Sequence, residues 1–357
     1  MIKTNQISGV RNYKVNTKNG IDDLYCTRSN LKFGDSKKFP KRILFDYLRE
    51  LSKKGLFKSV KDIIVWKGKN TEIELNLLIK SYNLHSNISE QICTKSYEFR
   101  GKDALHFYAN HAAQRLGGGI VSKGDSGFVQ EEKCTYRFSL IAPLAYKQLN
   151  DKLEYFDTNL GEIPLLIKTN VLLHEIFDGN FYGKLGLKML ADNPTTINKY
   201  YREHNTKPRI YWLCKAIPII QRKNGEDYSK LYKNYAIIEW SLFLCYKAYC
   251  LAIQTGETEK KINEITIHDG NWGCGAFGHN LNTIYVIEHM AINMAVQTMI
   301  PKKKVNFIYH TYDDQTKFKL KIGIDFWQQN RLKPYVQIFR YLKDFLIEKN
   351  PNWSDHL

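Results

Sequence analysis

The sequence predicts an α/β protein in which strands alternate with helices around a sheet. Short apolar runs typical of buried strands recur between longer segments with helical spacing. Two glycine-rich loops follow such runs, as in sheets that bind ligands beyond the carboxyl ends of their strands. Of the 357 residues, 43% are hydrophobic and 13% aromatic, which is enough to bury a substantial core.

The N-terminal part is predicted to be a polar lead-in followed by a small helical accessory region. Residues 1–40 are polar and interrupted by glycines, so we expect little regular structure there. Residues 40–98 begin with apolar side chains at helical spacing, and helix-like segments follow at 72–81 and 87–95. The main domain is predicted to occupy residues 99–357.

The main domain is predicted to consist of short strands and three longer helices. We expect strands at 104–110, 162–167, 209–220, 264–268 and 305–309. We expect helices at 235–253, 284–300 and 334–348. The most apolar window, 235–253, contains Glu239 and Lys247, so a buried core helix explains it better than a membrane span.

Cysteine and histidine usage bears on compartment and cofactors. The seven cysteines are odd in number and lack paired spacing, which favours reduced thiols in the cytoplasm or nucleus. The N-terminus lacks the apolar core of a signal peptide, so we expect no signal peptide and no transmembrane segment. The ten histidines show no metal-ligand spacing, and we expect neither a metal nor a cofactor.

The charge balance predicts an anionic partner. The formal net charge is +17, which attracts polyanions and acidic substrates. The alternative is that these lysines and arginines only solvate the surface. Nucleic acid fits the charge but has no support from the motifs, so it is not the favoured partner.

The two glycine-rich loops carry the predicted chemistry. Gly117, Gly118 and Gly119 precede a ten-residue spacer and then Gln130-Glu131-Glu132. A glycine triplet lets backbone N–H groups face one concavity, which suits phosphate, and adjacent carboxylates can supply the acid for glycosidic-bond cleavage. The segment Gly270–Gly278 repeats the phosphate-loop pattern later in the chain. Together the loops suggest a ligand with two phosphates between two sugars.

Both loops resemble those of the poly(ADP-ribose) glycohydrolases. The family signature of a glycine triplet, a spacer and Gln-Glu-Glu stands at 117–132, and its phosphate loop matches residue for residue over 270–278. The resemblance extends over roughly 100 to 345. It implies a macrodomain-like mixed sheet flanked by helices, with an N-terminal helical accessory region. It also implies a hydrolase that cleaves the ribose–ribose bonds of poly(ADP-ribose) and releases ADP-ribose.

The resemblance also assigns roles to individual residues. Glu132 would be the general acid and then activate water, and Glu131 would hydrogen-bond the ribose hydroxyls. Substrate-binding roles fall on Asn110, Gly117, Gly118, Gly119, Gln130, Asn271, Gly273, Cys274, Gly275, Ala276, Phe277 and Tyr312. Cys274 could be mistaken for a reactive thiol, and the alternative is that it is a small side chain packed between glycines. For Tyr312 the alternative to a ligand contact is a position in the core.

The sequence leaves the substrate and even the activity class open. The spacer before Gln130 is longer than the family's usual one, which allows a hydrolase of mono-ADP-ribosylated protein, for example on arginine. A second alternative is a module that binds ADP-ribose without cleaving it. Such a module would need the phosphate loops but not Glu131 and Glu132.

Overall fold

We describe the fold from a computed structural model of the whole chain. The structure describes residues 11–16, 62–67, 88–95, 97, 105–112, 164–169, 174–176, 201–203, 210–216, 235–274, 279–311 and 313–342.

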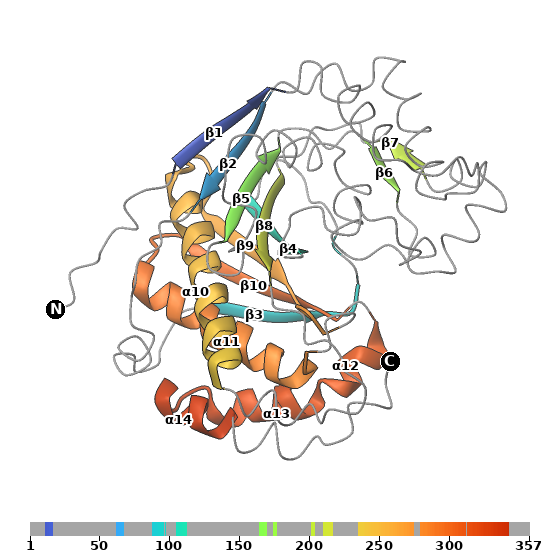
Figure 1. Cartoon of the computed structure of the whole chain (residues 1–357), viewed down its shortest axis with the longest axis vertical. Helices are drawn as coiled ribbons and strands as arrows, with labels where there is room; N and C mark the ends of the chain where they lie inside the picture. Colours follow the sequence, from blue (N-terminus) through green and yellow to red (C-terminus); the bar gives the residue numbers. More distant parts are fainter. Residues whose placement is uncertain are drawn as a thin grey trace.

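An eight-stranded mixed sheet forms the centre of the fold (Figure 1). Its parallel part runs in the order β8 (Ile210–Ala216), β4 (Leu105–Ala112), β9 (Glu264–Asp269), β10 (Lys304–His310) and β3 (Ile88–Cys93). Beyond β8, the sheet continues with antiparallel pairings through β5 (Leu165–Thr169), β2 (Asp62–Lys67) and β1 (Arg11–Asn16). A separate short pair joins β6 (His174–Ile176) and β7 (Tyr201–Glu203).

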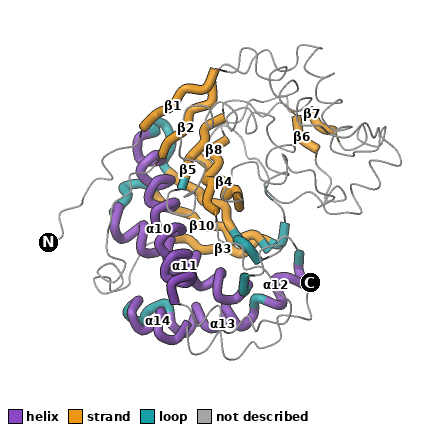
Figure 2. Tube along the Cα trace, in the orientation of Figure 1, coloured by secondary structure: helices purple, strands orange, loops and turns teal. Residues whose placement is uncertain are grey.

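Two long helices cover one face of the sheet and bury its apolar side (Figure 2). Helix α10 (Tyr235–Thr258) packs against β5, β8 and β9 and against α11 (Leu281–Met299). Helix α13 (Lys321–Asn330) packs on α11, with α12 (Asp314–Lys319) before it and α14 (Tyr335–Tyr341) after it. The α/β class with a mixed sheet and helices packed against it is therefore confirmed.

Most predicted elements of the main domain are present. The strands predicted at 104–110, 209–220, 264–268 and 305–309 correspond to β4, β8, β9 and β10, and β5 overlaps the strand predicted at 162–167. The predicted helices correspond to α10, α11 and α14. Helix α10 is largely buried in the core, as predicted. None of the described helices combines the length and hydropathy needed for a membrane span.

The helix predicted over 87–95 is wrong, because Ile88–Cys93 forms strand β3. Ile88 and Ile92 are four residues apart, which fits a helix face, but Glu90 between them points to the same side of the strand. Its Oε1 accepts a hydrogen bond from Asn293 Nδ2 (2.7 Å) and its Oε2 accepts one from Trp327 Nε1 (2.9 Å). An inward-facing carboxylate thus concealed the two-residue alternation that marks a strand.

The N-terminal region contributes strands to the main sheet. Strand β1 lies in the predicted lead-in, and β2 and β3 lie in the predicted accessory region. The predicted helices near 43–55 and 72–81 lie outside the described residues and stay predictions. So do the predicted domain boundaries.

The face of the sheet opposite α10 and α11 carries a row of histidines. His106 Nδ1 lies 2.8 Å from His268 Nε2, and His268 Nδ1 lies 3.0 Å from His310 Nε2. His310 Nδ1 donates to the carbonyl oxygen of Lys95 at 2.7 Å. The ring of Tyr108 stacks on His268 with centroids 4.5 Å apart. The three histidines come from the neighbouring strands β4, β9 and β10, and all three are buried.

Candidate functional site

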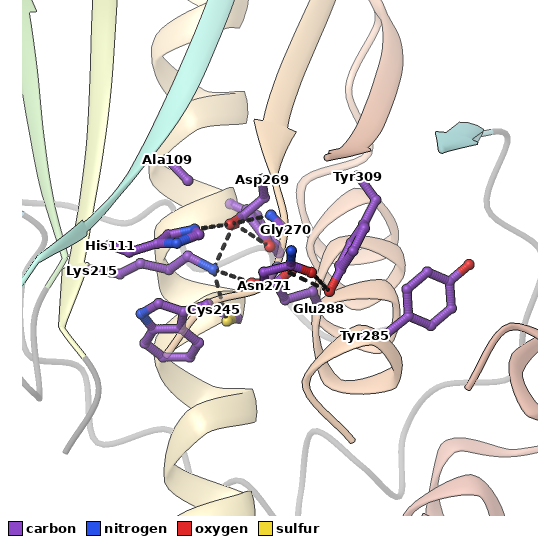
Figure 3. Close-up of polar contacts among 12 residues, drawn as sticks. Ala109, His111, Lys215, Cys245, Asp269, Gly270, Asn271, Tyr285, Glu288 and Tyr309 are labelled. Atoms are coloured by element: carbon purple, nitrogen blue, oxygen red, sulfur yellow. Dashed lines mark hydrogen bonds and ion pairs between the residues drawn. The ribbon is translucent and has the colours of Figure 1, made fainter. Parts of the chain in front are cut away.

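Polar side chains gather at the carboxyl ends of four parallel strands (Figure 3). His111 comes from the end of β4, Lys215 from the end of β8, Asp269 from the end of β9 and Tyr309 from the end of β10. Because parallel strands end at the same edge, residues far apart in sequence meet there. Glu288 of α11 reaches the same place from the helix layer.

Asp269 is the centre of this cluster and is fully buried. Its Oδ1 accepts hydrogen bonds from Gly270 N and from His111 Nε2, both at 2.9 Å. Its Oδ2 contacts Lys215 Nζ at 2.6 Å and accepts a bond from Tyr249 Oη at 2.7 Å. Burial alone would raise the pKa of Asp269, but the Lys215 ammonium and the His111 hydrogen bond outweigh it and hold that pKa well below its usual value.

Lys215 supplies the positive charge of the cluster. Its Nζ also donates to Glu288 Oε1 at 2.7 Å and lies 4.3 Å from the ring centre of Trp272, a cation–π contact. Burial alone would lower the pKa of Lys215, but the adjacent carboxylate of Asp269 outweighs burial and raises that pKa above the usual value. Lys215 is therefore charged in the folded protein.

Glu288 differs from Asp269 in its ionisation. Burial, with the nearby Asp269 carboxylate, raises the pKa of Glu288 well above its usual value. Its Oε2 is buried and accepts no hydrogen bond from any described residue. Burial also raises the pKa of Cys245, whose Sγ lies 3.5 Å from Lys215 Nζ, so that this group stays a neutral thiol. Lys215 and Asp269 are the charged pair, and Glu288 and Cys245 are weaker acids beside it.

The glycine loop that follows β9 starts directly on this cluster. Gly270 has φ 135°, and a Cβ there would lie 2.3 Å from the carbonyl oxygen of His310, so this backbone requires glycine. Asn271, with φ 52°, donates from its backbone N to Tyr309 Oη at 3.0 Å, and Tyr309 Oη donates back to Asn271 Oδ1 at 3.2 Å. Asp269 and Tyr309 thus fix the first turn of the loop on both sides.

The rest of the loop closes before α11. The backbone N of Cys274 donates to Asn271 O and that of His279 donates to Gly273 O, each at 3.0 Å. Helix α11 then begins at Leu281, with Asn280 as N-cap accepting from Thr283 N at 2.8 Å. The N-terminus of a long helix therefore follows the loop, as phosphate-binding loops require.

Four of the predicted site residues are described, namely Asn110, Asn271, Gly273 and Cys274. Asn110 is buried near the end of β4, while the other three belong to the β9–α11 loop. Burial raises the pKa of the Cys274 thiol, which agrees with packing between glycines rather than with a reactive thiol. Trp272 is fully buried beneath the loop, over Lys215.

The other predicted site residues lie outside the described residues. They are Gly117, Gly118, Gly119, Gln130, Glu131, Glu132, Gly275, Ala276, Phe277 and Tyr312. Their roles stay predictions.

Sequence reasoning missed four residues of the cluster, namely His111, Lys215, Asp269 and Glu288. Two of them carried a signal in the sequence. Asp269 stands directly before Gly270, and Lys215 interrupts the apolar strand 210–216. A lysine inside a buried strand needs an anionic partner, but nothing local says which one.

Comparisons with known proteins find similarity among solved structures. No protein-family model and no curated protein matches the chain. Among solved structures, it is similar to poly(ADP-ribose) glycohydrolase from Thermomonospora curvata (12% identity, TM-score 0.45, 80% of this chain and 98% of that one). It is also similar to poly(ADP-ribose) glycohydrolase from Deinococcus radiodurans in complex with ADP-ribose (12% identity, TM-score 0.41, 71% of this chain and 90% of that one). A third similar structure is an Oceanobacillus iheyensis macrodomain with MES bound (12% identity, TM-score 0.37, 68% of this chain and 91% of that one).

Proposed function

We propose that this protein is a hydrolase that cleaves ADP-ribose glycosidic bonds. The observation that carries the proposal is the pair of motifs with their spacing, 117–132 and 270–278. A nine-residue phosphate loop together with a spaced glycine triplet and Gln130-Glu131-Glu132 is far more specific than a lone glycine motif.

The described part of the second loop supports a binding site for phosphate. Positive φ angles at Gly270, Asn271 and Gly273 turn the backbone sharply within a few residues. Buried hydrogen bonds to Asp269 and Tyr309 hold the first turn, so little ordering is needed when a ligand arrives. The loop lies at the edge where α/β sheets bind ligands.

In the proposed mechanism, Glu132 protonates the oxygen that leaves the anomeric carbon of the cleaved ribose. The glycosidic C–O bond breaks as positive charge develops on that sugar. Water then attacks the anomeric carbon while the Glu132 carboxylate takes its proton, which restores the acid. Glu131 binds the ribose hydroxyls, and Gln130 and Asn110 complete the polar surroundings.

The substrate follows from charge and spacing. The net charge of +17 suits a polyanion such as poly(ADP-ribose), with ADP-ribose as product. The ten-residue spacer before Gln130 also allows a narrower site for a single ADP-ribosyl unit on protein. We propose poly(ADP-ribose) first and mono-ADP-ribosylated protein second.

The test compares wild type with Glu132→Gln on poly(ADP-ribose), on mono-ADP-ribosyl arginine, and on mono-ADP-ribosyl carboxylate or serine. Free ADP-ribose is measured over time, and ADP-ribose affinity is measured alongside. We expect release from one substrate to fall about 10²–10⁴-fold in Glu132→Gln with affinity retained. Glu264→Gln, the same change at an exposed carboxylate of β9, is the matched control and should leave release unchanged.

Three results would speak against the proposal in different ways. Tight ADP-ribose binding without release from any substrate would identify a binding module instead. Release that persists in Glu132→Gln would move the acid to another residue. No binding of ADP-ribose would remove the ligand class altogether.

A further inference from the structure

Three potential metal donors meet in the buried cluster. One atom each from His111, Asp269 and Glu288 lies within 4.8 Å of the other two. An imidazole nitrogen with two carboxylate oxygens is a donor set that divalent cations use in proteins. The three residues come from β4, β9 and α11, so the fold itself brings them together.

A cation already occupies the place between the carboxylates. The ammonium of Lys215 lies 2.6 Å from Asp269 Oδ2 and 2.7 Å from Glu288 Oε1. The side chains of Lys215 and Asp269 are fully buried, and that of His111 is 8% exposed. We propose that Lys215 is the built-in cation of a His–Asp–Glu cation site, and that removing its side chain converts the cluster into a site for a divalent metal ion.

The surrounding atoms favour Zn²⁺ over Mg²⁺ as that ion. Cys245 Sγ lies 3.5 Å from Lys215 Nζ, so a sulfur atom adjoins the place that the ammonium occupies. Glu288 Oε2 is buried and accepts no hydrogen bond from any described residue, which leaves a further oxygen. Zn²⁺ accepts such mixed nitrogen, sulfur and oxygen ligands, whereas Mg²⁺ prefers oxygen and retains water.

The tethered cation helps to hold the shape of the loop. Lys215 holds Asp269, and Asp269 accepts from the backbone N of Gly270 and from His111. Lys215 also lies against the ring of Trp272 beneath the same loop. This cation site does not depend on the proposed hydrolase activity.

The test uses two variants of the full chain that both lose the charge. Lys215→Ala removes the charge and empties the space, whereas Lys215→Met removes the charge but fills the space with an apolar side chain. Thermal midpoints are measured for both variants and for wild type with EDTA, Zn²⁺, Mg²⁺ or ethylammonium, the last being a free analogue of the lysine head group.

We expect both variants to unfold at lower temperature than wild type. Zn²⁺ should raise the midpoint of Lys215→Ala by several degrees, because an ion that binds only the folded state stabilises it. Ethylammonium should raise it less, and Mg²⁺ least. The thermal midpoints of Lys215→Met and wild type should change with each cation only by the small amount that is also common to Lys215→Ala. Adding His111→Ala to Lys215→Ala should remove most of the Zn²⁺ effect.

Several results would overturn the proposal. One is a Lys215→Ala midpoint that neither Zn²⁺ nor ethylammonium raises, and another is an equal rise in Lys215→Met. If Lys215→Ala does not fold in buffer, its refolding yield from urea is measured with each cation instead. Recovery with Zn²⁺ or ethylammonium supports the built-in cation, and no recovery with any of them contradicts it.

Discussion

The two faces of the central sheet bury polar groups in different ways. On the face toward α10 and α11, Lys215, Asp269 and Glu288 form a charged cluster at the edge of the sheet. On the opposite face, His106, His268 and His310 form a row of hydrogen-bonded rings. Neighbouring residues such as His268 and Asp269 point to opposite faces because side chains alternate along a strand.

The difference lies in what each network needs to be satisfied. The histidine row ends at the carbonyl oxygen of Lys95, which can only accept, so His310 donates from Nδ1. Hydrogen bonds from ring to ring link His268 to His106 on one side and to His310 on the other. The charged cluster is satisfied only when Lys215 and Asp269 are both present. A charged network is therefore the more fragile of the two, and it is the one that supports the glycine loop.

The largest expected effect is the loss of one charge from the cluster. Asp269→Asn keeps the side-chain shape but leaves the buried Lys215 ammonium without its main counter-ion. We expect the free energy of unfolding to fall by about 3–5 kcal/mol, measured by urea denaturation. Glu264→Gln is the control on the same strand, because Glu264 pairs with Lys304 at 3.4 Å in an exposed position. It should cost less than about 1 kcal/mol. Equal costs would mean that the cluster is no more fragile than a surface pair.

A smaller effect is expected when the histidine row is broken. His268→Phe retains a flat ring against Tyr108 but removes the hydrogen bonds to His106 and His310. We expect a loss of about 1–3 kcal/mol in the free energy of unfolding, since two buried groups lose a partner. Thr266→Val is the control, because the Asn306 Nδ2–Thr266 Oγ1 distance is a long 3.5 Å. If His268→Phe costs as much as Asp269→Asn, the charged cluster is no more fragile than the histidine row.

The smallest expected effect concerns His289, a buried histidine of helix α11. Burial lowers the pKa of His289, whose Nδ1 donates to Tyr285 O at 2.7 Å. The unfolded chain, with an ordinary pKa near about 6.5, therefore binds more protons, and stability is lost as pH falls from there through the lowered pKa of the folded state.

The measurement is the pH dependence of the difference in unfolding free energy between wild type and His289→Gln. The wild-type advantage should shrink between pH 7 and pH 5 by at most about 1.4 kcal/mol per pH unit. All other titratable groups are common to both proteins, so the difference reports on His289. A difference that does not change with pH would show that His289 does not titrate in this way.

Local patterns in the sequence predicted much of the fold. The sequence predicts β4, β8 and β10 because each contains a short apolar run, and it predicts β9 because apolar and polar residues alternate over 264–268. Helices α10 and α11 were predicted because their apolar residues extend over several turns. The strand β3 was missed because Glu90 interrupts its apolar pattern, and the satisfying partners Asn293 and Trp327 lie about 200 residues away or more.

The sequence by itself determined the order of the longer strands and of helices α10, α11 and α14 in the main domain, and the two glycine-rich motifs, because these depend on neighbouring residues. Only the tertiary structure decided that Lys215 pairs with Asp269 and Glu288. A lysine in an apolar strand has the same local pattern whatever its partner is. The partner is fixed by which strands end side by side and which helix covers them, and only the low dielectric of that buried site makes the pairing obligatory.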